Sequence, residues 1–107
     1  MKLLITIVQD QDVPNLLEAL AEEEFGATRL SSTGGFLRTG NTTLLIGVAK
    51  EKLDQVLDLI KKVCKKREQA PSSALLPFGK ARGSGLRKVV VGGAIIFMVE
   101  IERFEKI

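Results

Sequence analysis

The sequence has no histidine and one cysteine, Cys64, among its 107 residues. Without histidine the chain lacks the usual general base near neutral pH. One cysteine excludes an intramolecular disulfide and the ligand spacing of a zinc ribbon. Neither a Walker loop nor a strand-linked GxGxxG motif is present. We therefore expect a binding protein rather than an enzyme, with no catalytic site, no metal and no resident cofactor.

Long apolar runs are also missing. The longest, VVVGGAIIFMV, is too short to cross a bilayer as a helix, and acidic residues interrupt the apolar start MKLLITIVQDQD before a signal-peptide core could form. The 16 Lys and Arg exceed the 13 Asp and Glu by only three, which is too small an excess to indicate nucleic-acid binding on its own. We expect a cytoplasmic single domain over residues 1–107, long enough to support one core.

Two hydrophobic periods alternate along the chain. Short apolar runs predict a strand at 3–8, paired strands at 26–33 and 42–49, and a strand or strand pair within 87–104 that is interrupted at Gly92–Gly93. Apolar residues at helical spacing predict a helix at 12–24 and a second helix that begins at 51 and ends in KKVCKK. Asp10 and Asp12 follow the first strand, where a metal could bind, but Asp12 is better explained as the cap of the first helix. Cys64 lies on the apolar stripe of the second helix and is expected to be buried. A long loop without regular period occupies residues 68–86.

The order βαββαβ is that of the α+β, ferredoxin-like split βαβ arrangement, which places both helices on one face of a four-stranded sheet. The other face of a monomer should then be polar. The first strand, however, is apolar at every position from Leu3 to Val8 except Thr6. Because no further helix is predicted that could cover the second face, we expect a homo-oligomer.

Two glycine-containing stretches are candidate binding loops. STGGFLRTGNTT contains glycines that can expose backbone N–H groups to a phosphate, the amide Asn41, and Phe36 as a stacking surface for a base. The alternative is a long hairpin turn with Phe36 in the core. GKARGSGLRK carries Lys80 and Arg82, which could form a lid over an anion or a partner-binding arm, or could lie on a solvated loop.

The strings IVQDQD, ATRLSSTGGFLRTGNTT, REQ, and VGGA followed by Phe97 resemble the PII-like cyclic di-AMP receptor family. The resemblance runs from residue 1 to about 104 and weakens between 70 and 88. It implies a ferredoxin-like subunit, a homotrimer, and a nucleotide bound in three clefts between subunits and reported through mobile loops. The downstream protein partner is unknown, and neither a nucleic-acid polymer nor membrane insertion is expected.

The resemblance also implies which residues bind the ligand. The contacts carried over are Thr28, Gly35, Phe36, Leu37, Asn41 and Gly47, with Gly92 a further candidate. Phe36 would present an apolar surface to the base, and Asn41 would help to read it. Arg38 could meet a phosphate or pair with a carboxylate of the next subunit, and Lys80 and Arg82 are possible lid contacts.

Two positions depart from the family pattern, which commonly has asparagine at position 24 and arginine at position 26. Here they are Glu24 and Gly26. A lost cation and an added carboxylate both disfavour a dianionic ligand, and Arg29 should point to the opposite face of its strand from Thr28. The resemblance nevertheless makes cyclic di-AMP the first expectation, and another adenine nucleotide or an anionic metabolite is the second. The rival interpretation is a trimeric protein-interaction module that has lost cyclic di-AMP binding.

Overall fold

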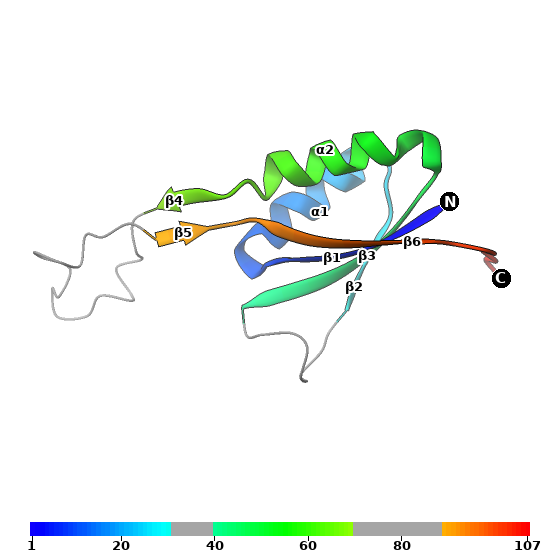
Figure 1. Ribbon diagram of the computed structural model, residues 1–107, viewed down its shortest axis with the longest axis horizontal. Coiled ribbons are helices and arrows are strands. Elements are labelled where there is room, and N and C mark those ends of the chain that lie inside the picture. Colours follow the sequence, from blue (N-terminus) through cyan, green and yellow to red (C-terminus); the bar gives the residue numbers. More distant parts are fainter. Residues whose placement is uncertain (31–39, 70–88) are drawn as a thin grey trace, which may run out of the picture.

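The computed structural model describes residues 1–30, 40–69 and 89–107. They form a four-stranded antiparallel sheet, with both helices on one face, and a two-stranded ribbon at one end (Figure 1). The sheet order is β2 (Ala27–Leu30), β3 (Asn41–Val48), β1 (Lys2–Gln9) and β6 (Ala94–Glu100). The helices are α1 (Val13–Glu22) and α2 (Leu53–Val63), preceded by the 3-10 turns η1 (Asp10–Asp12) and η2 (Lys50–Lys52), and the ribbon pairs β4 (Arg67–Gln69) with β5 (Val89–Val91). This order is consistent with the predicted ferredoxin-like α+β fold.

The core lies between the sheet and the helices. Side chains alternate between the two faces of a strand, and residues paired across antiparallel strands share a face. Even-numbered β1 residues such as Leu4 and Val8 therefore face the helices together with β3 residues such as Ile46, which pairs with Leu4. They pack against the helical stripes that carry Leu16 and Ile60, and all of these side chains are buried. Cys64 belongs to this core, which confirms the expectation that it is a buried apolar residue.

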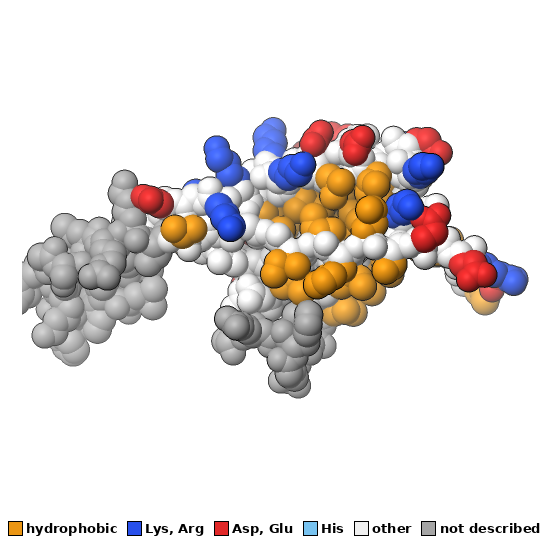
Figure 2. Space-filling view, viewed as in Figure 1, with side chains coloured by type: hydrophobic (Ala, Val, Ile, Leu, Met, Phe, Trp, Pro, Cys, Tyr) orange, Lys and Arg blue, Asp and Glu red, His pale blue; other side chains and the backbone are white. Residues whose placement is uncertain are grey.

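The opposite face of the sheet, here called the open face, is also apolar. Ile5 and Ile7 of β1 are half-buried, and their β6 partners Phe97 and Ile95 are 49% and 58% exposed. In Figure 2 hydrophobic side chains gather around β6, while most charged side chains lie over the helices and toward the two ends of the molecule. Thr6, the one polar residue of the predicted strand 3–8, faces the helices and not the open face. The β1 part of the open face, from Leu3 to Ile7, is therefore entirely apolar.

The structure corrects the role of Asp12. Its side chain makes no capping hydrogen bond, because Asp12 closes η1 with φ −91° and ψ −10°, whereas a capping residue is normally extended. Its carboxylate instead accepts a hydrogen bond from the Arg67 guanidinium at 2.6 Å. Arg67 opens β4, so Glu68 and Gln69 lie in a strand and not in the predicted loop. The final strand pair is divided between two sheets, with Gly92 and Gly93 between β5 and β6.

Helix α1 ends in a backbone motif that the sequence did not indicate. The Phe25 N–H donates to the Leu20 carbonyl at 2.8 Å and the Glu24 N–H to the Ala21 carbonyl at 2.9 Å. This is the Schellman pattern, in which the residue after the helix cap takes a left-handed conformation. Glu24 occupies that position with φ +63°, the only positive φ among the described non-glycine residues. The motif turns the chain into β2, which forms one side of the site described next.

Candidate functional site

Four of the predicted ligand contacts lie in the described residues: Thr28, Asn41, Gly47 and Gly92. The others, Gly35, Phe36, Leu37, Arg38, Lys80 and Arg82, lie outside them. The structure divides the four into two pairs, each lining a different hollow.

The first hollow, here called the C-terminal hollow, has a volume of about 930 Å3 and contains Thr28 and Gly47. Strand register explains their proximity, since Thr28 of β2 pairs with Leu45 of β3, two residues before Gly47. A Cβ atom added to Gly47 would meet nothing within 4 Å, so the missing side chain leaves open space above the strand. The remaining lining residues are Met1, Leu3, Gly26, Ala27, Leu45, Ile101, Phe104, Glu105, Lys106 and Ile107. The hollow thus combines a mostly apolar surface with few polar groups, as binding sites for planar organic ligands commonly do.

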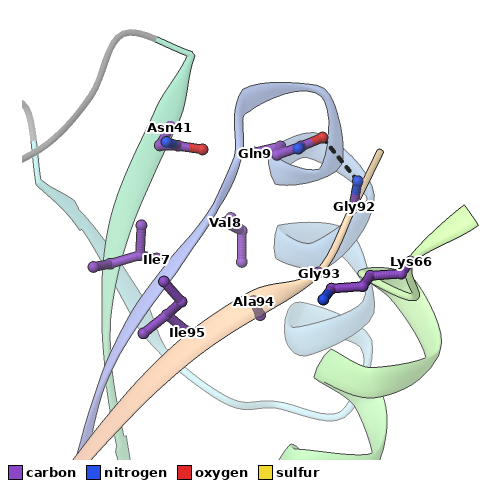
Figure 3. Close-up of a pocket in the computed structure, with 9 residues that line it drawn as sticks. All are labelled: Ile7, Val8, Gln9, Asn41, Lys66, Gly92, Gly93, Ala94 and Ile95. Atoms are coloured by element: carbon purple, nitrogen blue, oxygen red, sulfur yellow. Dashed lines mark hydrogen bonds between the residues drawn. The ribbon is translucent and has the colours of Figure 1, made fainter. Parts of the chain in front are cut away.

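The second hollow, here called the ribbon-base hollow, measures about 290 Å3 and contains Asn41 and Gly92 (Figure 3). Gln9 pairs with Asn41 in the β1–β3 register, and the Gly92 N–H donates to the Gln9 side-chain oxygen at 2.8 Å. Lys66 also lines the hollow, and Figure 3 shows its side chain reaching past Gly93. This hollow is small, but it brings two amide side chains and one cation together at the base of the ribbon.

The two pairs lie at opposite ends of β3. Asn41 and Gly47 are six residues apart in an extended strand, which corresponds to about 20 Å. Within one chain, the structure therefore does not bring the four described contacts into a single cavity.

A polar network joins the ribbon to the sheet beside the second hollow. Arg67 donates to the buried Asp12 carboxylate and, at 2.8 Å, to the Lys65 carbonyl, while the Gly93 N–H donates to the Cys64 carbonyl. The hydrogen bond from Arg67 to Asp12 raises the pKa of the Arg67 guanidinium. Burial, with a smaller effect of the Asp12 charge, raises the pKa of the Cys64 thiol to about 11. Cys64 is thus an inert thiol next to a fixed ion pair.

Gly92 is constrained by this network. Its φ is +89°, and an added Cβ would lie 2.5 Å from the Lys65 carbonyl oxygen and 2.6 Å from a guanidinium nitrogen of Arg67. Gly92 was predicted from the sequence, but Gln9, which accepts its N–H, and Arg67, which lies against it, were not. The signal was present, since both belong to strings, IVQDQD and REQ, that carry the family resemblance.

The two departures at positions 24 and 26 have different surroundings. Gly26 lines the C-terminal hollow, and a Cβ placed there would meet nothing within 4 Å. Glu24 is exposed and is not among the described residues that line either hollow. The residue type at position 24 matters for the backbone conformation, because asparagine tolerates a left-handed φ better than glutamate does. Arg29 pairs with Leu44 on the helix side of the sheet, on the opposite face from Thr28, as alternation predicted.

Asp10 also has a structural role. Its carboxylate accepts a hydrogen bond from the Thr42 hydroxyl, and its N–H donates to the Gly40 carbonyl at 2.8 Å. These contacts join η1 to the start of β3. In residues 1–30, 40–69 and 89–107, no group of three His, Cys, Asp or Glu side chains is placed to hold a metal. None of the helices in these ranges is long and apolar enough to cross a membrane.

Comparison with known proteins gives two matches over nearly the whole chain. The model of a family described as cyclic-di-AMP receptor matches residues 1–107. A crystal structure of a protein of unknown function from Pediococcus pentosaceus ATCC 25745 is 38% identical in sequence and superimposes with a TM-score of 0.78. The match covers 99% of this chain and 96% of that one. The likeness therefore extends well beyond the sheet to the elements that line both hollows.

Proposed function

Because this chain belongs to the cyclic-di-AMP receptor family, we propose that it binds cyclic di-AMP in clefts between the subunits of a homotrimer and signals through loop rearrangement. The observation that carries the proposal is the C-terminal hollow, which places Thr28 and Gly47 over an apolar floor. Two predicted contacts thus share a cavity large enough for a nucleotide base, since small-molecule sites commonly have volumes of about 300–1,000 Å3.

The separation of the two hollows supports a site between subunits. Thr28 and Gly47 lie at one end of β3, and Asn41 lies at the other. A cyclic arrangement of copies uses heterologous contacts, in which different parts of neighbouring chains meet. Such an interface can place one end of the sheet of one subunit against the other end in the next. The predicted contacts would then converge on one ligand.

The open face supports the homotrimer. Ile95, Phe97 and Val99 of β6 are each at least 45% exposed beside an apolar β1. Apolar patches of this kind are typical of protein interfaces. Light scattering after size exclusion should give three times the mass of the chain, and Phe97→Glu should reduce the mass to that of a monomer. A monomeric wild-type protein at micromolar concentration would contradict the trimer.

Calorimetry against a panel of cyclic and linear adenine nucleotides tests the ligand. Cyclic di-AMP should bind with the highest affinity, and Phe36→Ala should weaken binding without lowering the melting temperature. If melting collapses while affinity per folded protein is unchanged, Phe36 belongs to the core.

One observation favours a second candidate function. Gly26 offers no side chain to an anion in the C-terminal hollow. A receptor without that cation would suit a less charged adenine nucleotide or another metabolite, or would act as a trimeric interaction module with no small ligand. Tighter binding of a different nucleotide in the panel would select the first of these, and no binding at all would select the module.

A further inference from the structure

The C-terminal segment, residues 101–107, lies against the predicted nucleotide contacts. It follows β6, and the Ile101 N–H donates to the Met1 carbonyl at 3.0 Å, which fixes the segment beside the start of β1. From this anchor, Phe104, Glu105 and Lys106 line the same hollow as Thr28. None of these three residues was among the predicted ligand contacts.

Phe104 is the most exposed of the described phenylalanines. Its side chain is 65% exposed, and it lies at the edge of a hollow whose floor is formed by Leu3 and Leu45. An exposed aromatic ring beside an apolar cavity can cover a planar ligand, and such stacking on bases contributes measurably to nucleotide affinity.

The charges of the hollow are few. Among the described side chains that line it, Glu105 and Lys106 are the charged ones, and the Met1 amino group adds a cation from the backbone. Glu105 is paired with Arg103, whose Nε donates to it at 3.1 Å. Gly26 contributes no charge, so Lys106 is the side-chain cation available to an anionic group in this hollow. Because a dianionic ligand is attracted by each nearby cation, the position of Lys106 matters more here than in a site that has an arginine on β2.

We propose that residues 101–107 form the outer wall of the nucleotide site, in which Phe104 covers the base and Lys106 meets a phosphate. The inference rests on the proposed function and deepens it by naming two specificity-determining residues. Lys106 supplies from the C-terminal segment the positive charge that position 26 does not.

The experiment measures the affinity of the full chain for cyclic di-AMP by calorimetry at two salt concentrations. Lys106→Gln should weaken binding roughly tenfold, as expected for the loss of one charged hydrogen bond. It should also reduce the dependence on salt. Lys52→Gln is the matched control, because it removes the same charge from an exposed residue that does not line the hollow. Phe104→Ala should weaken binding several-fold without changing the melting temperature, because the ring is mostly exposed.

Rescue by a second site distinguishes a local from a general effect. Gly26→Arg should restore affinity in the Lys106→Gln background, since the arginine side chain would enter the same hollow. If wild type binds cyclic di-AMP and both Lys106→Gln and Phe104→Ala bind as tightly, the wall is overturned while the proposed function stands. If wild type binds no nucleotide, the proposed function fails and the wall falls with it. If Lys52→Gln weakens binding as much as Lys106→Gln does, the net charge of the chain explains both effects, and the role of Lys106 is overturned.

Discussion

Replacing Glu24 by glycine should stabilise the fold, because Glu24 holds the left-handed position of the Schellman motif at φ +63°. A residue with a Cβ atom loses about 1–2 kcal/mol in this conformation. Glycine avoids that cost but loses about 0.5–1 kcal/mol more conformational entropy on folding. Removing a negative charge from the C-terminal end of a helix adds about 0.3–1 kcal/mol. We therefore expect the free energy of unfolding to rise by about 1 kcal/mol, and the melting temperature by roughly 4 °C.

Urea unfolding at fixed protein concentration measures the effect, with Glu22→Gly as the control. Glu22 is exposed and carries the same charge, but it is the last residue of α1 and has helical geometry. Glycine at a helical position costs about 1 kcal/mol, so Glu22→Gly should lose stability or remain near neutral. Glu24→Asn should gain part of the stability of Glu24→Gly, since asparagine tolerates this region. Equal changes at positions 22 and 24 would refute the argument, because charge alone would then explain both.

Three further predictions concern the base of the ribbon. Gly92→Ala should destabilise the chain more than Gly93→Ala. Both glycines have φ +89°, but only at Gly92 would the new Cβ lie 2.5 Å from a backbone carbonyl oxygen. Equal urea midpoints for the two variants would contradict this. Arg67→Gln should lower the urea midpoint, since it leaves the Asp12 carboxylate, which is 2% exposed, without its cation, whereas Asp12→Asn should lower it less. The pKa of Cys64 is raised to about 11, above its ordinary value of 9.0, so the folded chain holds that proton more tightly than the unfolded chain. The stabilisation from the neutral thiol is therefore complete below pH 9 and is lost as the pH rises toward 11. Over that interval the free energy of unfolding of the wild type should fall more than that of Cys64→Ala. Parallel curves of unfolding free energy against pH would refute the raised pKa.

The helices and sheet strands were predictable because each has a clear period. The run from Leu3 to Val8, apolar except at Thr6, predicts a buried strand, and the stripe containing Val56 and Ile60 predicts a helical face. The pairing of the two hairpin strands was also predicted, but their register, which sets Thr28 opposite Leu45, was not. These elements can be predicted from local patterns because the hydrophobic period that identifies each of them lies within its own residues.

Other features depend on contacts between distant residues. Asp12 looks like a helix cap until Arg67, 55 positions away, is brought beside it. The residues of β4 become a strand only by pairing with β5, on the far side of a long intervening segment. Likewise, nothing in the order of residues places Phe104 beside Thr28, because that neighbourhood arises from the path of the chain after β6. Glutamate has no preference for the left-handed backbone conformation, so the positive φ at Glu24 could not be predicted from the sequence either.

The pairing of β4 with β5 makes the domain tolerant of insertions at one place. Gln69 lies opposite Val89, so the two ends of the segment between them are already side by side, and both termini lie at the other end of the molecule (Figure 1). Closing a loop between fixed ends costs only about 0.6 kcal/mol more for each doubling of its length. A chain whose segment 70–88 is shortened, extended or exchanged for that of a relative should therefore keep its sheet and both hollows.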